Sequence, residues 1–145
     1  MKNMAVMIAV IIVAAICAAC GKMEEKKLEI DPGHVMKLYL ETWKKKDWEA
    51  LYAMTDPSFM QKLRTQRLTP EQREMSDRDL FVNEFQRAQR MNPGKVLKSC
   101  EILSIAGYKK GDTTLWGDVV VNGKKRRIPL TLDGLSLKVD LTRIE

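Results

Sequence analysis

Residues 113–141 read TTLWGDVVVNGKKRRIPLTLDGLSLKVDL, and the pattern of these residues predicts a β-sheet. Apolar and polar side chains alternate along much of it, as they do in half-buried β-strands. Asn122-Gly123 interrupts the alternation with the strongest short hairpin signal, because both central residues of a type I′ turn need positive φ. Asp133-Gly134 supplies a second hairpin turn. Together with a mixed strand before it, the stretch predicts an antiparallel meander over residues 96–105, 113–121, 124–132 and 135–141.

Ahead of this stretch the sequence carries helix signals. Capping side chains precede apolar segments, three of them with proline at the first helical position, at Asp31-Pro32, Asp47, Asp56-Pro57, Thr69-Pro70 and Ser76. The last helical stripe stops at Asn92-Pro93-Gly94. Helices followed by a meander indicate an α+β domain, in which one face of the sheet packs on helices and the other meets water.

The composition limits what such a domain can do. The chain has 145 residues, a one-domain length, and its 45% apolar and 30% charged residues exclude a disordered or polytopic membrane protein. One histidine and three cysteines exclude most histidine-based metal sites and a dense disulfide framework. Walker loops, glycine-rich dinucleotide turns and Gly-x-Ser-x-Gly elbows are missing from the sequence. We therefore expect no metal, no cofactor and no catalytic residues.

The N-terminus indicates export. Met1–Asn3 is a short basic start, and Met4–Ile16 follows without a polar side chain. This arrangement is typical of the first two regions of a signal peptide. A membrane-spanning anchor is the alternative, but spanning needs about 20 apolar residues and the apolar stretch here ends at Ala19.

The end of this segment, Ala18-Ala19-Cys20-Gly21, resembles the lipobox of bacterial lipoproteins. In that family the cysteine thiol takes a diacylglycerol, a peptidase cuts before it, and the new amine is often acylated. The resemblance implies a signal peptide over residues 1–19, cleavage between Ala19 and Cys20, and lipid on Cys20. Gly21 is not the aspartate that retains lipoproteins in an inner membrane. The resemblance thus implies a lipid anchor in the cell envelope, on the outer membrane facing the periplasm if the host has two. A secreted, soluble protein without a lipid anchor is the remaining alternative.

Residues 20–30 are interpreted as the lipidated cysteine and a charged tether, and residues 31–145 as the domain. If Cys17 is removed and Cys20 carries lipid, Cys100 is left without a cysteine partner. It lies in an apolar segment, where a buried, inert thiol is expected.

The segments VMKLYLETW (35–43) and KDWEAL (46–51), with GLSLKVD (134–140) near the end, resemble the nuclear-transport-factor-2-like superfamily. The resemblance covers roughly Asp31 to Glu145. It implies a cone of helices on a curved antiparallel sheet with a partly apolar pocket, used for small-molecule binding, occasional catalysis or dimerisation. Many bacterial lipoproteins of unassigned function share this arrangement.

Four aromatic residues are candidates for lining such a pocket: Tyr39, Trp43, Tyr52 and Trp116. Aromatics at helical spacing also fill cores, and that alternative stays open. The isomerases of the superfamily need an aspartate in the pocket, whereas alternation places Asp118 and Asp140 on the outside. His34 falls on the polar stripe of the first helix, where an exposed histidine is expected.

Basic residues gather at Lys44–Lys46, Lys109-Lys110 and Lys124–Arg127. Members of the last group alternate between the two faces of a strand. These basic side chains either lie in solvent or contact anionic lipid head groups, and both interpretations stay open. No nucleic-acid partner is expected for an exported protein.

The expected function is a non-enzymatic, membrane-anchored envelope lipoprotein whose domain binds a small apolar ligand or an envelope protein. The alternatives are a dimerisation or interaction module with a filled pocket, a homodimer among them, and an isomerase- or hydratase-like enzyme.

Overall fold

A computed structural model describes residues 31–109, 111–133 and 136–145. The predicted signal peptide, Cys20 and the tether lie outside the described residues. Helices come first: α2 (Pro32–Lys45), α3 (Trp48–Ala53), α4 (Pro57–Arg64), α5 (Pro70–Glu74), α6 (Asp77–Met91) and the short 3-10 turn η1 (Pro93–Lys95). Four strands follow: β1 (Cys100–Ile105), β2 (Thr114–Val121), β3 (Lys124–Asp133) and β4 (Ser136–Val139). The predicted α+β class is confirmed.

The helices begin where the sequence predicted. Asp31, Asp47 and Asp56 accept hydrogen bonds from backbone N–H groups in the first turns of α2, α3 and α4. Thr69 forms a complete capping box for α5, and Ser76 caps α6. These side chains satisfy N–H groups that have no partner inside a helix, which fixes each start.

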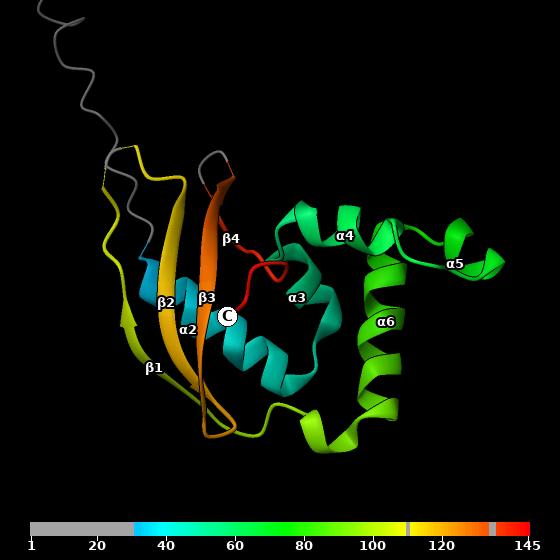
Figure 1. Ribbon diagram of the computed structural model, residues 1–145, viewed down its shortest axis with the longest axis horizontal. Coiled ribbons are helices and arrows are strands. Elements are labelled where there is room, and N and C mark those ends of the chain that lie inside the picture. The colour runs from blue at the N-terminus through cyan, green and yellow to red at the C-terminus, as the bar shows by residue number, and fades with distance from the viewer. Residues whose placement is uncertain (1–30, 110, 134–135) are drawn as a thin grey trace, which may run out of the picture.

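The strands form one antiparallel sheet in the order β1-β2-β3-β4. The predicted hairpin turn is confirmed, with φ of 50° at Asn122 and 77° at Gly123. Figure 1 shows the sheet on the left, with α2 crossing behind it and α3, α4 and α6 on the right. The predicted first strand was too long, because β1 begins only at Cys100, and the Asn122 side chain bonds the backbone of Val96, Lys98 and Ser99 ahead of it.

The core lies between α2 and one face of the sheet. Met36 and Tyr39 on α2 are fully buried, as are Val119, Leu130 and Val139 on the strands. The helix approaches so closely that a Cβ added at Gly117 would lie 2.9 Å from the Met36 Cε atom. A side chain at this position would therefore have to displace the end of the Met36 side chain. Other parts of the domain do not cover α2 on all sides, because the Leu38 side chain on this helix is 45% exposed.

Other segments of the chain bond to the sheet along its β4 edge and beside β3. Thr55 forms a parallel bridge with Val139 beside β4. Where β4 does not reach, Glu145 and Arg127 exchange backbone hydrogen bonds beside β3. Asp118 is exposed on the outer face, as expected.

The expectation that Asp140 points outward is wrong, because its residue exposure is only 4%. Alternation ends at Val139, where β4 stops and the chain turns. The Asp140 carboxylate accepts from the Thr142 N–H at 2.9 Å and from the Ser58 hydroxyl at 3.3 Å. An aspartate that bonds the backbone two residues on forms a turn, and the turn carries the side chain inward.

Candidate functional site

The four aromatic residues proposed for a pocket lie in three places. Tyr39 and Trp43 meet edge to face on α2, with ring centroids 6.0 Å apart. Tyr52 borders a different hollow beside α4. Trp116 lies on the outer face of the sheet, where the guanidinium of Arg127 is 4.8 Å from its ring centroid. The structure therefore brings together Tyr39 and Trp43, and it separates Trp116 from both.

Tyr39 belongs to the filled core. Its hydroxyl lies 3.3 Å from the Thr55 hydroxyl, which donates its own hydrogen to the Leu51 carbonyl at 2.7 Å. A hydroxyl has one hydrogen, so Tyr39 is the donor of this pair. Burial raises the pKa of Tyr39 far above its ordinary value, and the Thr55 hydrogen bond offsets only part of this rise. The side chain stays neutral and is occupied within the protein.

Trp43, by contrast, borders two adjoining depressions at one end of the core, of about 160 and 140 Å³. Both depressions are lined by Trp43, Lys95 and Leu97, and we call them together the Trp43 groove. Its apolar lining comes from α2, α3, α6, η1–β1 and the strands, through Leu40, Trp48, Phe85, Val96, Val121, Ile128 and Ile144. Each depression is smaller than the roughly 300–1,000 Å³ typical of sites for drug-sized ligands.

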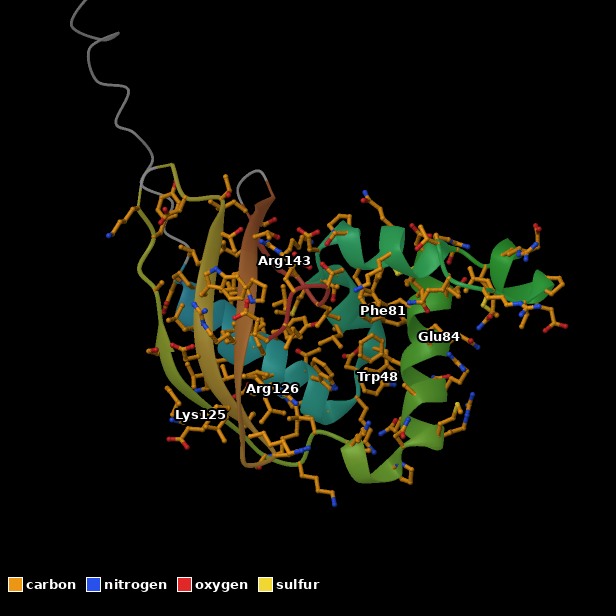
Figure 2. The ribbon with its side chains drawn as sticks, in the orientation of Figure 1. Trp48, Phe81, Glu84, Lys125, Arg126 and Arg143 are labelled. Atoms are coloured by element: carbon orange, nitrogen blue, oxygen red, sulfur yellow. The ribbon has the colours of Figure 1, made fainter. Side chains whose placement is uncertain are left out.

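Contacts between aromatic rings form one wall of the groove. Phe85 on α6 lies 5.7 Å from Trp43 and 5.2 Å from Trp48, measured between ring centroids. Behind it, Phe85 stacks on Phe81 at 4.5 Å. Figure 2 shows Trp48 and Phe81 between α3 and α6. These rings are contributed by three helices and contact one another, so the wall is formed by tertiary packing rather than by a single helix.

The rim of the groove is basic. Arg126 faces Val119 across the β2–β3 ladder, which places it on the helix-facing side of the sheet. Lys125 faces Val120 on the opposite side, and in Figure 2 Arg126 lies between the sheet and the helices while Lys125 lies beyond the strands. The predicted alternation of these basic residues is confirmed. None of the described residues lining the groove is acidic.

Asn122 fixes the wall that carries Lys95 and Leu97. Its side-chain oxygen accepts from the N–H groups of Lys98 at 2.8 Å and Ser99 at 3.1 Å. Its side-chain nitrogen donates to the Val96 carbonyl at 2.8 Å. One turn residue thereby ties the hairpin between β2 and β3 to the segment leaving η1.

A second hollow, of about 460 Å³, lies beside α4 and includes Tyr52. Its charged groups already have partners within the described chain. Arg64 pairs with Asp77 at 2.7 Å, Lys138 donates to the Ala53 carbonyl, and Asp56 accepts from Thr131. A ligand there would have to break these contacts, so this larger hollow is the weaker candidate.

A third hollow, of about 470 Å³, borders β1, β2 and β3, with Lys125, Arg126 and Arg127 in its lining. There Arg127 pairs with Asp118 at 3.4 Å and with Glu145 at 3.3 Å. Both carboxylates of this hollow are thus already engaged by Arg127 within the protein.

The buried carboxylate of Asp140 is a structural group rather than a general base. Burial raises its pKa, but hydrogen bonds from Thr142 and Arg143 outweigh the burial, and the net pKa falls below the ordinary 3.8. A poised acid or base at neutral pH would need the opposite shift. Its contacts with Ser58 and Arg143 join the end of the sheet to α4 and to the C-terminal turn.

The other chemistry-bearing residues have ordinary surroundings. His34 is exposed, as expected. Cys100 is a free thiol, but it is only partly buried, so the expectation of a buried thiol holds only in part. In the part of the chain that the structure describes, no group of three or more His, Cys, Asp or Glu residues could hold a metal ion.

Sequence reasoning identified Trp43 but missed Phe85, Lys95, Leu97 and Arg126 as its neighbours. Phe85 belonged to a predicted apolar stripe, and Arg126 belonged to a basic run with alternating faces. Nothing in the sequence indicated that α6 and the β2–β3 hairpin meet at Trp43, because that contact is set by tertiary packing.

Comparison with protein-family models, with curated proteins and with solved structures found no match. Among the residues from 31 onward that the structure describes, no helix has the length and apolar character needed to cross a membrane.

Proposed function

We propose that this chain is an envelope lipoprotein, anchored through lipid on Cys20, whose α+β domain binds a small apolar ligand in the Trp43 groove and performs no catalysis. One observation carries the binding part of the proposal. The groove combines an aromatic wall and aliphatic side chains with a few polar residues, and linings of this composition are typical of ligand sites. The observation that carries the anchoring part is the Ala18-Ala19-Cys20-Gly21 sequence.

The nuclear-transport-factor-2-like assignment belongs to the same proposal. It is supported by the order of elements, with an apolar first helix packed on an antiparallel meander. The Lys46-Asp47-Trp48 break, where Lys46 has φ of 61° and ends α2, also agrees with the sequence resemblance. In a cone of this kind the Trp43 groove lies at one end of the space between the first helix and the sheet.

A second candidate is an interaction or dimerisation module with a filled interior. One observation favours it. Met36, Tyr39 and Val119 are fully buried, so the space between the middle of α2 and the sheet holds side chains rather than a cavity. If the chain is such a module, the Trp43 groove binds no small molecule, and the domain binds another protein instead. An isomerase-like enzyme has less support, because the fully buried Tyr39 bonds a threonine and the Asp140 pKa is lowered.

Native mass spectrometry of the protein released from membranes of its own host tests both parts. The proposal predicts a covalent mass increase of lipid size that disappears in Cys20→Ser. It also predicts a noncovalent adduct that is lost on gentle activation. A chain with neither increase would contradict the proposal, and a bare dimer would favour the interaction module.

A further inference from the structure

Two cations border the Trp43 groove without an acidic neighbour in its described lining. Lys95 borders both depressions, and Arg126 borders the one lined by Leu40 and Ile128. The next residue in the chain, Arg127, behaves differently, because it pairs with Asp118 and Glu145 on the outer face. Arg126 also borders the hollow that holds Asp118 and Glu145, but both of these carboxylates form their ion pairs with Arg127.

Both cations stand on positioned backbone. Arg126 belongs to β3 and faces the fully buried Val119, so its stem leaves the sheet at the margin of the core. Lys95 closes η1, and the following residue, Val96, is bonded through its carbonyl to Asn122. A charge on fixed backbone loses less freedom when it meets a ligand than a charge on a mobile loop does.

This arrangement selects a class of ligand. A neutral apolar molecule would contact the aromatic wall but would leave both cations at the rim without a role. A molecule with an apolar chain and an anionic head group would satisfy both parts at once, since guanidinium groups bind carboxylate and phosphate in a bidentate manner. The small volume of each depression suits one narrow chain better than a branched or two-chain molecule.

From this complementarity we infer that the Trp43 groove binds single-chain amphiphiles with an anionic head group. The chain lies along Trp43, Leu97 and Ile128, and the carboxylate or phosphate lies between Lys95 and Arg126. The inference rests on the proposed function, because it names the ligand class of that same groove. A free fatty acid and a single-chain phospholipid share this chemistry, and the choice of head group distinguishes them.

The test uses the protein expressed from the full chain and reconstituted in nanodiscs, with empty nanodiscs as the blank. Four probes of equal chain length are titrated at neutral pH: decanoate, decyl phosphate, decanol and decyltrimethylammonium. Binding is followed by calorimetry and by the tryptophan fluorescence of the protein. The variants are Lys95→Gln and Arg126→Gln, with Lys125→Gln as the matched control, because Lys125 is the neighbour of Arg126 on the opposite face of β3.

We expect at least one anion to bind about tenfold more tightly than decanol, as one charge-assisted hydrogen bond allows. Arg126→Gln and Lys95→Gln should each remove most of this preference, and Lys125→Gln should leave it unchanged. A stronger response to decanoate or to decyl phosphate identifies the head group. Thermal unfolding of each variant verifies that the fold is kept.

Two negative outcomes are distinguishable. If decanol and both anions bind equally, the inference is overturned while ligand binding at the groove stands. If no probe binds, both the inference and the binding part of the proposed function are overturned. Loss of the preference in Lys125→Gln to the same extent as in Arg126→Gln would also overturn the inference, because it would indicate nonspecific attraction to a basic surface.

Discussion

Arg126 lies directly opposite Val119 in the register between β2 and β3, so a basic residue shares a sheet face with the core. Two residues later, Ile128 is buried on that same face, while Arg127 between them turns outward to Asp118. A single strand therefore carries a cation to each side of the sheet. The cation on the inner side borders one of the two depressions of the Trp43 groove.

The first prediction concerns Asn122, whose side chain holds the groove wall. Asn122→Gly keeps the positive φ of the hairpin turn, since glycine adopts it without strain, but removes three side-chain hydrogen bonds. We expect a loss of about 1 kcal/mol in unfolding free energy. Hydrogen exchange at the Lys98 and Ser99 amides should become faster.

Asn122→Asp is the matched control for that change. It keeps an acceptor for the two amides and loses only the donation to the Val96 carbonyl. Asn122→Asp should therefore accelerate hydrogen exchange at the Lys98 and Ser99 amides less than Asn122→Gly does. Equal exchange in all three proteins would mean that the Asn122 side chain does not hold this wall.

The second prediction concerns the buried carboxylate of Asp140. Its pKa is lower in the folded protein than the ordinary 3.8, so its contribution to stability is present above that value and is lost as pH falls through the folded pKa. Asp140→Asn should therefore lower the unfolding free energy at neutral pH by about 1–3 kcal/mol, because Arg143 and Thr142 lose a charged acceptor.

Denaturant titrations of wild type and Asp140→Asn at several pH values measure this difference in unfolding free energy. The difference between the two proteins should shrink steadily once the pH is below about 4. A difference that stays constant down to the most acidic pH at which the protein folds would show that the Asp140 charge does not stabilise the fold.

The third prediction concerns the close approach of α2 to the sheet. Gly117→Ala would place a Cβ atom 2.9 Å from Met36 Cε and 3.5 Å from Ile105 Cγ1. Overpacking of this kind costs about 1–3 kcal/mol. In a Met36→Leu background the terminal Cε is gone, so the same substitution should cost less.

A double-mutant cycle measured by thermal or chemical unfolding gives the coupling between the two positions. We expect Gly117→Ala to be less destabilising by about 0.5 kcal/mol or more when Met36 is replaced. Additive effects would mean that the alanine is accommodated without displacing the methionine.

Much of this fold could be predicted from local signals. Helix starts are predicted by Asp31, Asp56 and Ser76, and a hairpin is predicted by Asn122-Gly123. Each of these signals acts through backbone groups a few residues away. The antiparallel meander follows from period-two alternation. These features need no knowledge of what packs against them.

The remaining features depended on contacts between distant residues. Asp140 was misplaced because alternation holds only while a strand continues, and the strand ends one residue earlier. Tyr39 and Trp43 share a helix and looked equivalent, yet one is buried under the sheet and the other borders a groove. Trp116 was grouped with them although β2 turns it to the opposite face. Arg126 gained its place beside Trp43 through the packing of β3 on α2.

The comparison of two tryptophans tests the central claim most directly. Trp43→Leu changes the groove, and Trp116→Leu makes the same substitution on the outer face of the sheet. Native mass spectrometry of both variants and the wild type, released from host membranes, measures the fraction carrying a noncovalent adduct. We expect Trp43→Leu to lose the adduct while its unfolding transition stays cooperative, and we expect Trp116→Leu to keep the adduct. An adduct retained in Trp43→Leu, or lost equally in both, would contradict ligand binding at the groove.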